Sequence, residues 1–320
     1  MDGFNRAYGR VFVPGRLTVG LMTPMAGESG ALADLEVAQQ HARLADALGF
    51  AALWTRDVPL MIPQGSANET AALDDPFLWL AALAAVTERI VLATGAVVLP
   101  LRHPLHVAKA ALSLDRISHG RLLLGLGSGD RPEEFARFGA DLETRDVAFR
   151  DHWETLRAAL EPGAAEDGQY RVLPPPQARI PMLAIGSARQ SLQWIAAHAD
   201  GWASYHREED RQKGRIALWE MAQDQRSPGM RKPFVQSVQL DLLDDPAAPL
   251  DAIELGLRTG RHALAAYLER MRELGVAHIL FNLHRGARPT EDVLRELGAE
   301  ILPQALGFAK VSPPRILLTQ

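Results

Sequence analysis

The chain has 320 residues, a net charge of −5 and no cysteine, and 47% of its residues are hydrophobic. Without cysteine, it cannot form disulfides, zinc–thiolate sites, iron–sulfur clusters or a cysteine nucleophile. The balance of Lys+Arg 34 against Asp+Glu 39 gives no general attraction to nucleic acid or to an anionic membrane. The apolar stretches are too short to span a bilayer, and the N-terminus lacks the apolar segment of a secretory signal. We therefore expect a cytoplasmic protein.

Short apolar runs alternate with longer segments of helical period along the whole chain. The predicted strands cover residues 17–22, 51–55, 90–99, 121–126, 181–185, 201–205, 234–240 and 277–283. The predicted helices cover residues 34–48, 76–88, 104–117, 145–160, 188–198, 208–223, 260–274 and 290–306. Helix signals support these ranges: Asp34 and Pro104 stand at helix starts, and Gly49 follows a helix end.

Strand–helix repeats with apolar, non-alternating strands are typical of a parallel sheet covered on both faces. The sequence therefore predicts an α/β fold, a single (β/α)8 TIM barrel. A doubly wound sheet is the competing fold, but no GxGxxG follows the first strand. We expect one domain over residues 1–320, with residues 1–16 as an N-terminal extension. Insertions are expected after the second strand, at 57–75, and in the C-terminal third, at about 227–259. The first could be a lid or a plain surface insertion.

The polar groups at the predicted strand ends are mostly hydroxyls, glycines and arginines, not clustered carboxylates or histidines. This composition disfavours a catalytic metal. Ser187 lacks the second glycine of a nucleophile elbow, which disfavours a serine hydrolase. A glycosidase would need two carboxylates at strand ends, and only Asp57 and Asp130 qualify by position.

Two glycine-containing turns after strands could bind a phosphate. Residues 186–191 join the fifth strand to a helix expected to begin near Ala188, so free N–H groups, the Ser187 hydroxyl and the helix end could converge on an anion. The alternative is an ordinary serine helix cap. The Ser128-Gly129 turn offers similar geometry after the fourth strand. Small residues at 93–96 could support a flat ring, or could equally allow a helix to pack closely.

Several stretches together resemble the luciferase-like flavin monooxygenase family. The first is Leu92-Ala93-Thr94-Gly95-Ala96-Val97-Val98-Leu99-Pro100-Leu101-Arg102-His103-Pro104. It is followed by Leu114-Asp115-Arg116-Ile117-Ser118-His119-Gly120-Arg121-Leu122 and Gly125-Leu126-Gly127-Ser128-Gly129. Later, Ile185-Gly186-Ser187 leads to Ala196-Ala197-His198-Ala199-Asp200-Gly201-Trp202. The resemblance extends from residue 17 to 306.

This resemblance implies a barrel that binds reduced flavin, either FMN or the deazaflavin F420, at the C-terminal mouth of its strands. The ring would contact Thr94 and Gly95 and lie near Met22, Thr23 and Trp54. The phosphate would lie at Gly186, Ser187 and Ala188, with help from Ser128 and Gly129. Bacterial luciferase carries a histidine after its second strand and an arginine after its fourth, whereas this chain has the segment 54–57 and Ser128 there. Light emission is therefore not expected.

The resemblance leaves the reaction open. In one version, reduced FMN and O2 oxygenate a small organic substrate; in the other, hydride passes between the ring and a substrate or NAD(P)H. Electrons could come from NAD(P)H or a partner flavin reductase, and a non-catalytic flavin-binding homologue is a further alternative. We expect Arg56, Asp57 and His284 to be catalytic. Asp130, Arg131, His206 and Arg285 are further candidates, and each could instead be a solvated or salt-bridged loop residue. The family also implies a homodimer; no metal, membrane or nucleic-acid partner is expected.

Overall fold

The computed structural model describes residues 3–26, 32–60, 73–163 and 172–305. Its centre is a closed barrel of parallel strands, confirming the predicted fold class. The barrel strands are β1 (Thr18–Thr23), β2 (Ala52–Thr55), β3 (Val91–Thr94), β5 (Leu122–Gly127), β6 (Met182–Ile185), β7 (Gly201–Tyr205), β8 (Phe234–Leu242) and β11 (Val276–Asn282). They pair in this order, and β11 closes the ring by pairing with both β1 and β8.

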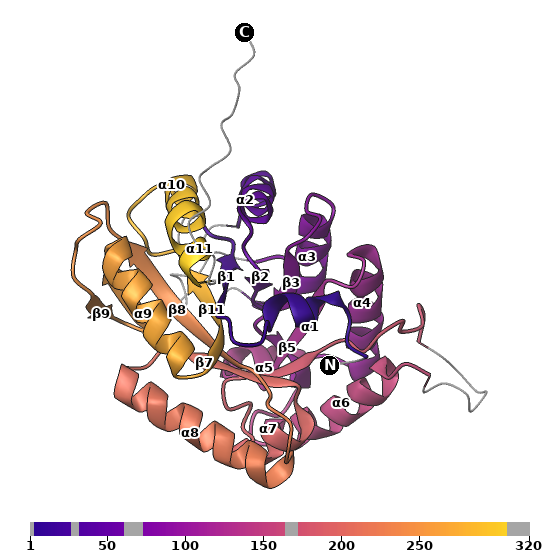
Figure 1. The fold of residues 1–320 in the computed structure, drawn as a ribbon. Helices are drawn as coiled ribbons and strands as arrows, with labels where there is room; N and C mark the ends of the chain where they lie inside the picture. The colour runs from indigo at the N-terminus through magenta and orange to yellow at the C-terminus, as the bar shows by residue number, and fades with distance from the viewer. Residues whose placement is uncertain (1–2, 27–31, 61–72, 164–171, 306–320) are drawn as a thin grey trace.

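Helices surround the barrel, as Figure 1 shows. They are α2 (Leu35–Leu48), α3 (Pro76–Ala84), α4 (Pro104–Ile117), α6 (Arg145–Leu160), α7 (Leu192–His198), α8 (Glu209–Arg226), α9 (Arg261–Glu273) and α10 (Thr290–Glu296). The cap signals are confirmed: the Asp34 carboxylate accepts two backbone N–H bonds at the start of α2, and Gly49 ends it at φ 93°.

Some elements differ from the sequence-based prediction. The strand expected over 90–99 divides into β3 and the short β4 (Val97–Val98), which is followed by a 3-10 turn, Leu99–Leu101. The helix expected over 290–306 consists of α10, a π-helical turn at Leu297–Ile301 and α11 (Leu302–Ala305). The helix α5 (Pro132–Phe138) was not predicted. These differences fall at element ends and in short segments, where local sequence signals are weakest.

The N-terminal extension contains a helix, α1 (Arg6–Val11), that covers the amino-terminal end of the barrel. Figure 1 shows it lying across the strand ring. Its side chains Ala7, Tyr8 and Val11 are buried in one apolar cluster with inward-facing barrel residues such as Leu123 and Val235. This cluster fills the barrel interior, whereas a second, larger cluster lies between strands and helices. The barrel is therefore filled at its amino-terminal end and can be hollow only toward the carboxyl ends of its strands.

The C-terminal insertion contains a hairpin that the sequence did not predict. It consists of β9 (Asp251–Ile253) and β10 (Gly256–Thr259), and β10 pairs in parallel with the end of β8. Strand β8 is consequently longer than expected: its first part pairs with β11 and its last part with β10. The hairpin thus lies beside the carboxyl end of the barrel. The possible lid over 57–75 falls largely outside the described residues.

Candidate functional site

Two adjoining cavities lie at the carboxyl ends of the strands. We call the larger one, of about 540 Å³, the outer chamber and the smaller one, of about 210 Å³, the inner chamber. The residues that line both chambers are Arg56, Gly95, Ile185, Gly186, Ser204 and Tyr205. This end of a (β/α)8 barrel is where its loops can assemble an active site.

The two chambers differ in charge. The arginines that line the outer chamber are Arg56, Arg131, Arg145, Arg189, Arg207 and Arg215. The acidic residues that line it are Asp57, Asp130 and Glu134. Two of these three carboxylates already have cationic partners, since Asp57 pairs with Arg102 and Glu134 with Arg131. Among the residues that the structure describes, Arg56 is the single charged residue that lines the inner chamber, and the others are apolar or uncharged and polar. The outer chamber therefore suits an anion, and the inner chamber suits an uncharged group.

Eight of the ten predicted cofactor-binding residues line these chambers. They are Met22, Trp54, Gly95, Ser128, Gly129, Gly186, Ser187 and Ala188. Thr23 and Thr94 lie elsewhere, because strand alternation turns them toward the helices. The Thr23 hydroxyl accepts a hydrogen bond from Trp79, and the Thr94 hydroxyl links β3 to β5 through the backbone of Gly125. Neither hydroxyl is directed at a ligand in the mouth.

The turn after β6 differs from the prediction. The helix expected to begin near Ala188 begins at Leu192, with Ser191 as its cap. The delay has a backbone cause: Ala188 and Arg189 have φ values of 45° and 57°, which no right-handed helix accepts. An anion at Ser187 would therefore meet the turn itself and the nearby arginines, and not the end of α7.

Gly186, in the same turn, also has a positive φ and leaves open space where a side chain would be. Its φ is 64°, and a side chain built on it would meet no atom within 4 Å. Its position is held by the backbone bond from its N–H to Ala203 and by the Trp202 indole, which donates to its carbonyl at 2.6 Å. Gly186 thus exposes bare backbone to both chambers.

Asp57, one of the predicted catalytic residues, is fully engaged with its neighbours. Both of its carboxylate oxygens accept hydrogen bonds of 2.8 Å from Arg102, and one of them also accepts from the backbone of Val98. Arg102 reaches Asp75 as well, at 2.8 Å. Burial alone would lower the pKa of Arg102, but the hydrogen bonds and charges of the two carboxylates outweigh it and raise that pKa. This network ties the chain after β2 to the start of α3.

The other predicted catalytic residues are placed differently from one another. Arg56 lines both chambers, and burial lowers its pKa below the ordinary value for arginine although the Tyr205 phenol opposes this shift. His284 is not among the lining residues of either chamber; its backbone N–H donates to the Asn282 side chain at 3.2 Å. Its catalytic role stays a prediction. Of the further candidates, Asp130 and Arg131 line the outer chamber.

His206 belongs to a buried polar group outside the two chambers. Its Nδ1 lies 3.0 Å from the Tyr267 hydroxyl and 2.9 Å from the Gln236 amide nitrogen, between the sheet and α9. Burial lowers the pKa of His206, which favours the neutral imidazole that accepts these bonds. The group therefore holds the end of β7 against the helix layer.

Trp54 forms part of the inner chamber and rests on a buried histidine. Its indole Nε1 donates to Nε2 of His278 at 3.1 Å, and Nδ1 of His278 lies 2.7 Å from the Thr18 hydroxyl. Because the indole can only donate, the proton of the neutral imidazole is on Nδ1 and is donated to Thr18. The Thr18 hydroxyl in turn donates to the Val11 carbonyl of α1 at 2.6 Å. Complete burial lowers the pKa of His278 to about 3.

Sequence reasoning missed two groups of lining residues. The first consists of Arg145 on α6 and Arg215 on α8, which no local pattern identifies because their approach to the outer chamber depends on how these helices pack. Arg189 lies in the turn over 186–191 and Arg207 in the loop after β7, so both are close to predicted strand ends. The second consists of Ser237 and Gln239 in the inner chamber. A signal existed for these: Val235, Ser237 and Gln239 alternate along β8, and the same alternation places them inside the barrel.

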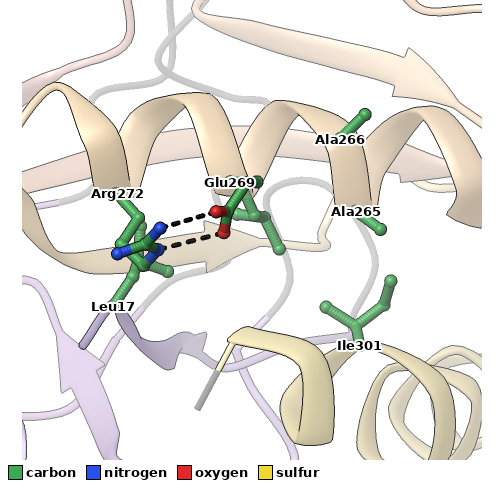
Figure 2. Close-up of a pocket in the computed structure, with 7 residues that line it drawn as sticks. Leu17, Ala265, Ala266, Glu269, Arg272 and Ile301 are labelled. Atoms are coloured by element: carbon green, nitrogen blue, oxygen red, sulfur yellow. Dashed lines mark hydrogen bonds and ion pairs between the residues drawn. The ribbon is translucent and has the colours of Figure 1, made fainter. Parts of the chain in front are cut away.

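A further cavity, of about 320 Å³, lies on the outside of the barrel between α9 and the π-helical turn. Figure 2 shows Leu17 and Ile301 beside it and the ion pair of Glu269 with Arg272, at 2.6 Å. Both partners of this pair lie on one exposed helix face, so we assign it no chemistry. Among the described residues, no three acidic or histidine side chains are grouped as metal ligands. No described helix is long and apolar enough to cross a membrane.

Comparison with known proteins identifies the family. The model of the luciferase-like monooxygenase family matches residues 11–301. A protein of uncharacterized function from Mycobacterium tuberculosis is 32% identical over 239 residues, covering 71% of this chain and 76% of that protein.

Solved structures share the fold. An F420-dependent secondary alcohol dehydrogenase, bound to an F420–acetone adduct, has a TM-score of 0.71 and 15% identity over 91% of this chain and 99% of that one. The oxygenating constituent of 3,6-diketocamphane monooxygenase from Pseudomonas putida, in complex with FMN, has a TM-score of 0.68 and 16% identity over 90% and 98% of the two chains. The barrel, the cavities at its mouth and the match over residues 11–301 agree: this chain belongs to the luciferase-like monooxygenase family.

Proposed function

We propose that this protein is an FMN-dependent monooxygenase that acts on a small organic substrate. The observation that carries the proposal is the charge contrast between the two chambers, which suits a molecule with an anionic end and an uncharged aromatic end. FMN has this form, with a phosphate at one end and an isoalloxazine ring at the other. When bound and reduced, the flavin supplies the electrons that activate O2.

The residues of the outer chamber fit a phosphate. Arg145 has a buried Nε atom with no hydrogen-bond partner among the described residues, although its Nη1 donates to the Leu142 carbonyl. The Ser187 hydroxyl accepts from the Arg189 backbone N–H at 3.2 Å and keeps its own proton to donate. The guanidinium and hydroxyl donors match phosphate oxygens in charge and geometry. We therefore place the phosphate near Ser187, Arg145 and Arg189.

The wall shared by the two chambers fits the ring. Gly95 and Gly186 expose backbone there, and Ile185 adds an apolar side chain. A flat ring on this wall would have its far edge in the inner chamber, above Trp54. Within the protein, Arg56 would then lie beside both the ring and the substrate, where its charge can orient polar groups. The pairing of Asp57 with Arg102 would hold this mouth in shape.

F420 is the second candidate cofactor. The arginines of the outer chamber outnumber the charges of one phosphate monoester, because Arg207 and Arg215 lie there in addition to those named above and to Arg131, which pairs with Glu134. A longer anionic side chain could use them. With F420, the same site would pass a hydride to or from a substrate, and O2 would not be needed.

Titration of the cofactor-free protein with FMN, reduced FMN and F420, followed by ring fluorescence, tests both candidates. We expect FMN to bind and the Ser187→Glu variant to bind it at least tenfold more weakly, because the new carboxylate repels the phosphate. Ser113→Glu, on the outer face of the barrel helix α4, adds the same charge elsewhere and should bind FMN normally. Binding of F420 but not FMN would replace the first candidate with the second. FMN binding without any reductant-dependent O2 consumption would mean a non-catalytic flavin protein.

A further inference from the structure

One wall of the inner chamber is uncharged and polar. Ser237 and Gln239 on β8 line it together with Asn282 on β11. Gln239 and Asn282 are direct partners in the register of these two strands. Because neighbouring strands lie about 4.8 Å apart and paired residues face the same side, the two amide side chains lie next to each other. They form an amide pair at the carboxyl edge of the barrel.

The hydrogen bonds of this amide pair are incomplete. Oε1 of Gln239 is buried and has no hydrogen-bond partner among the described residues. Oδ1 of Asn282 accepts from the His284 backbone, while none of the hydrogen bonds between described residues uses its Nδ2. A buried acceptor left without a donor is unfavourable in the folded protein. The wall thus presents an acceptor beside a donor to whatever occupies the chamber.

The hairpin of β9 and β10 contributes an apolar side chain to the lining of the same chamber. Leu255, at the tip between the two strands, lines the chamber with φ at 54°. Such a conformation is unfavourable for a non-glycine residue, so the surrounding structure must impose it. The Leu255 carbonyl accepts from the Gln239 backbone at 3.0 Å. The next residue must be glycine, because a side-chain carbon on Gly256 would lie 2.0 Å from the Gln239 carbonyl oxygen.

We propose that the amide pair and Leu255 form the substrate-recognition wall, and that the substrate is an uncharged molecule with a cis-amide edge, as in a lactam. Its N–H would donate to Oε1 of Gln239 and its neighbouring C=O would accept from Nδ2 of Asn282. Its apolar body would lie against Leu255 and Leu280. A carboxylate or a ketone has no proton to give to Oε1 of Gln239 and would leave that acceptor without a donor. This inference rests on the proposed function, because it takes the inner chamber to be the place where substrate meets the ring.

Calorimetric titration with two probes tests the proposal. The probes are 2-piperidone, a six-membered lactam, and cyclohexanone, a ring of the same size that only accepts hydrogen bonds. Each is titrated into the FMN-saturated protein and into the cofactor-free protein. We expect 2-piperidone to bind at least tenfold more tightly than cyclohexanone, the difference that about one buried hydrogen bond makes. The Gln239→Leu variant should abolish that difference and keep its FMN affinity within twofold.

A second variant covers the case in which Gln239→Leu does not fold. Leu255→Trp places a larger side chain in the chamber from an exposed hairpin tip and should weaken both probes together, without changing FMN affinity. Equal affinities of the two probes for the unaltered protein would overturn the proposal. A Gln239→Leu variant that loses tenfold in FMN affinity but still binds 2-piperidone normally would also overturn the proposal. The wall would then bind the pyrimidine edge of the flavin, which carries the same N–H and C=O pair. Failure of FMN and F420 to bind would overturn the proposed function instead, and the cofactor-free titration would still test the wall.

Discussion

The indole of Trp54 donates a hydrogen bond of 3.1 Å to His278, which is completely buried and neutral. One imidazole thereby supports the base of the inner chamber and, through Thr18, connects it to α1. Because these groups come from β1, β2 and β11, the three strands on that side of the barrel are fixed relative to one another.

Removing this imidazole should destabilise the protein strongly. In His278→Leu, the Trp54 indole N–H is left without an acceptor, at a cost of about 1–3 kcal/mol, and the Thr18 hydroxyl loses one bond but keeps the bond to Val11. We expect the free energy of unfolding, measured with urea, to fall by about 2–4 kcal/mol. His106→Leu, at an exposed position on α4, is the matched control and should change it by less than about 0.5 kcal/mol. A similar small loss in both variants would show that the buried bonds contribute little.

The same histidine should make stability depend on pH. The pKa of His278 is about 3 in the folded protein and about 6.5 in the unfolded chain, so only the unfolded chain takes up the proton between these values. The stabilising contribution is therefore complete above pH 6.5 and is lost as the pH falls toward 3, at about 1.4 kcal/mol per pH unit.

Urea unfolding of the protein and of His278→Gln between pH 7.5 and 4 measures this contribution. The other titrating groups are common to both chains, so they cancel in the difference between the two unfolding free energies. That difference should shrink as the pH falls below 6.5. A difference that stays constant would mean that the folded protein accommodates the charged imidazole.

Asp57 should prove structural. In Asp57→Asn, the bidentate ion pair with Arg102 is lost, while Asp75 continues to neutralise that guanidinium. We expect the free energy of unfolding to fall by about 2–3 kcal/mol. This is less than the cost of a buried unpaired charge, because Arg102 keeps Asp75 as its partner. FMN affinity should change by less than threefold, measured by fluorescence titration. If stability is retained and FMN-dependent turnover is lost, Asp57 acts in the chemistry as the sequence analysis expected.

Gly186 offers a test of the cofactor wall with a close control. Gly186→Ala adds a methyl group that points into open space in the mouth and also incurs the penalty of a positive φ, about 1 kcal/mol. Gly139→Ala, after α5, has nearly the same φ, 68°, and equally open surroundings, but does not line either chamber. Both variants should lose similar stability, and only Gly186→Ala should weaken FMN binding, by about tenfold. Equal FMN affinity in the two variants would place the ring elsewhere.

The elements and the barrel could be predicted because each depends on local patterns: apolar strands, helix period, Asp34 and Pro104 at helix starts. The β9–β10 hairpin could not, because its strands are held by pairing with the distant end of β8 and have little apolar pattern of their own. In the site, glycines and Ser187 at strand ends were visible in the sequence. Arg145 and Arg215 were not, because helices bring them to the mouth only after the chain has packed. Thr94 shows what a strand-end position leaves open: its hydroxyl faces the backbone of Gly125, and its predicted contact with a cofactor stays a prediction.

The helix α1 also limits the end of the barrel from which molecules can reach the two chambers. Ala7, Tyr8 and Val11 fill the amino-terminal end of the barrel, so that end is closed. Ligands must therefore enter through the carboxyl-terminal mouth. The inner chamber lies below the wall on which we place the flavin ring. A substrate that fills it would share this entrance with the cofactor, so the two would reach their places from the same end of the barrel.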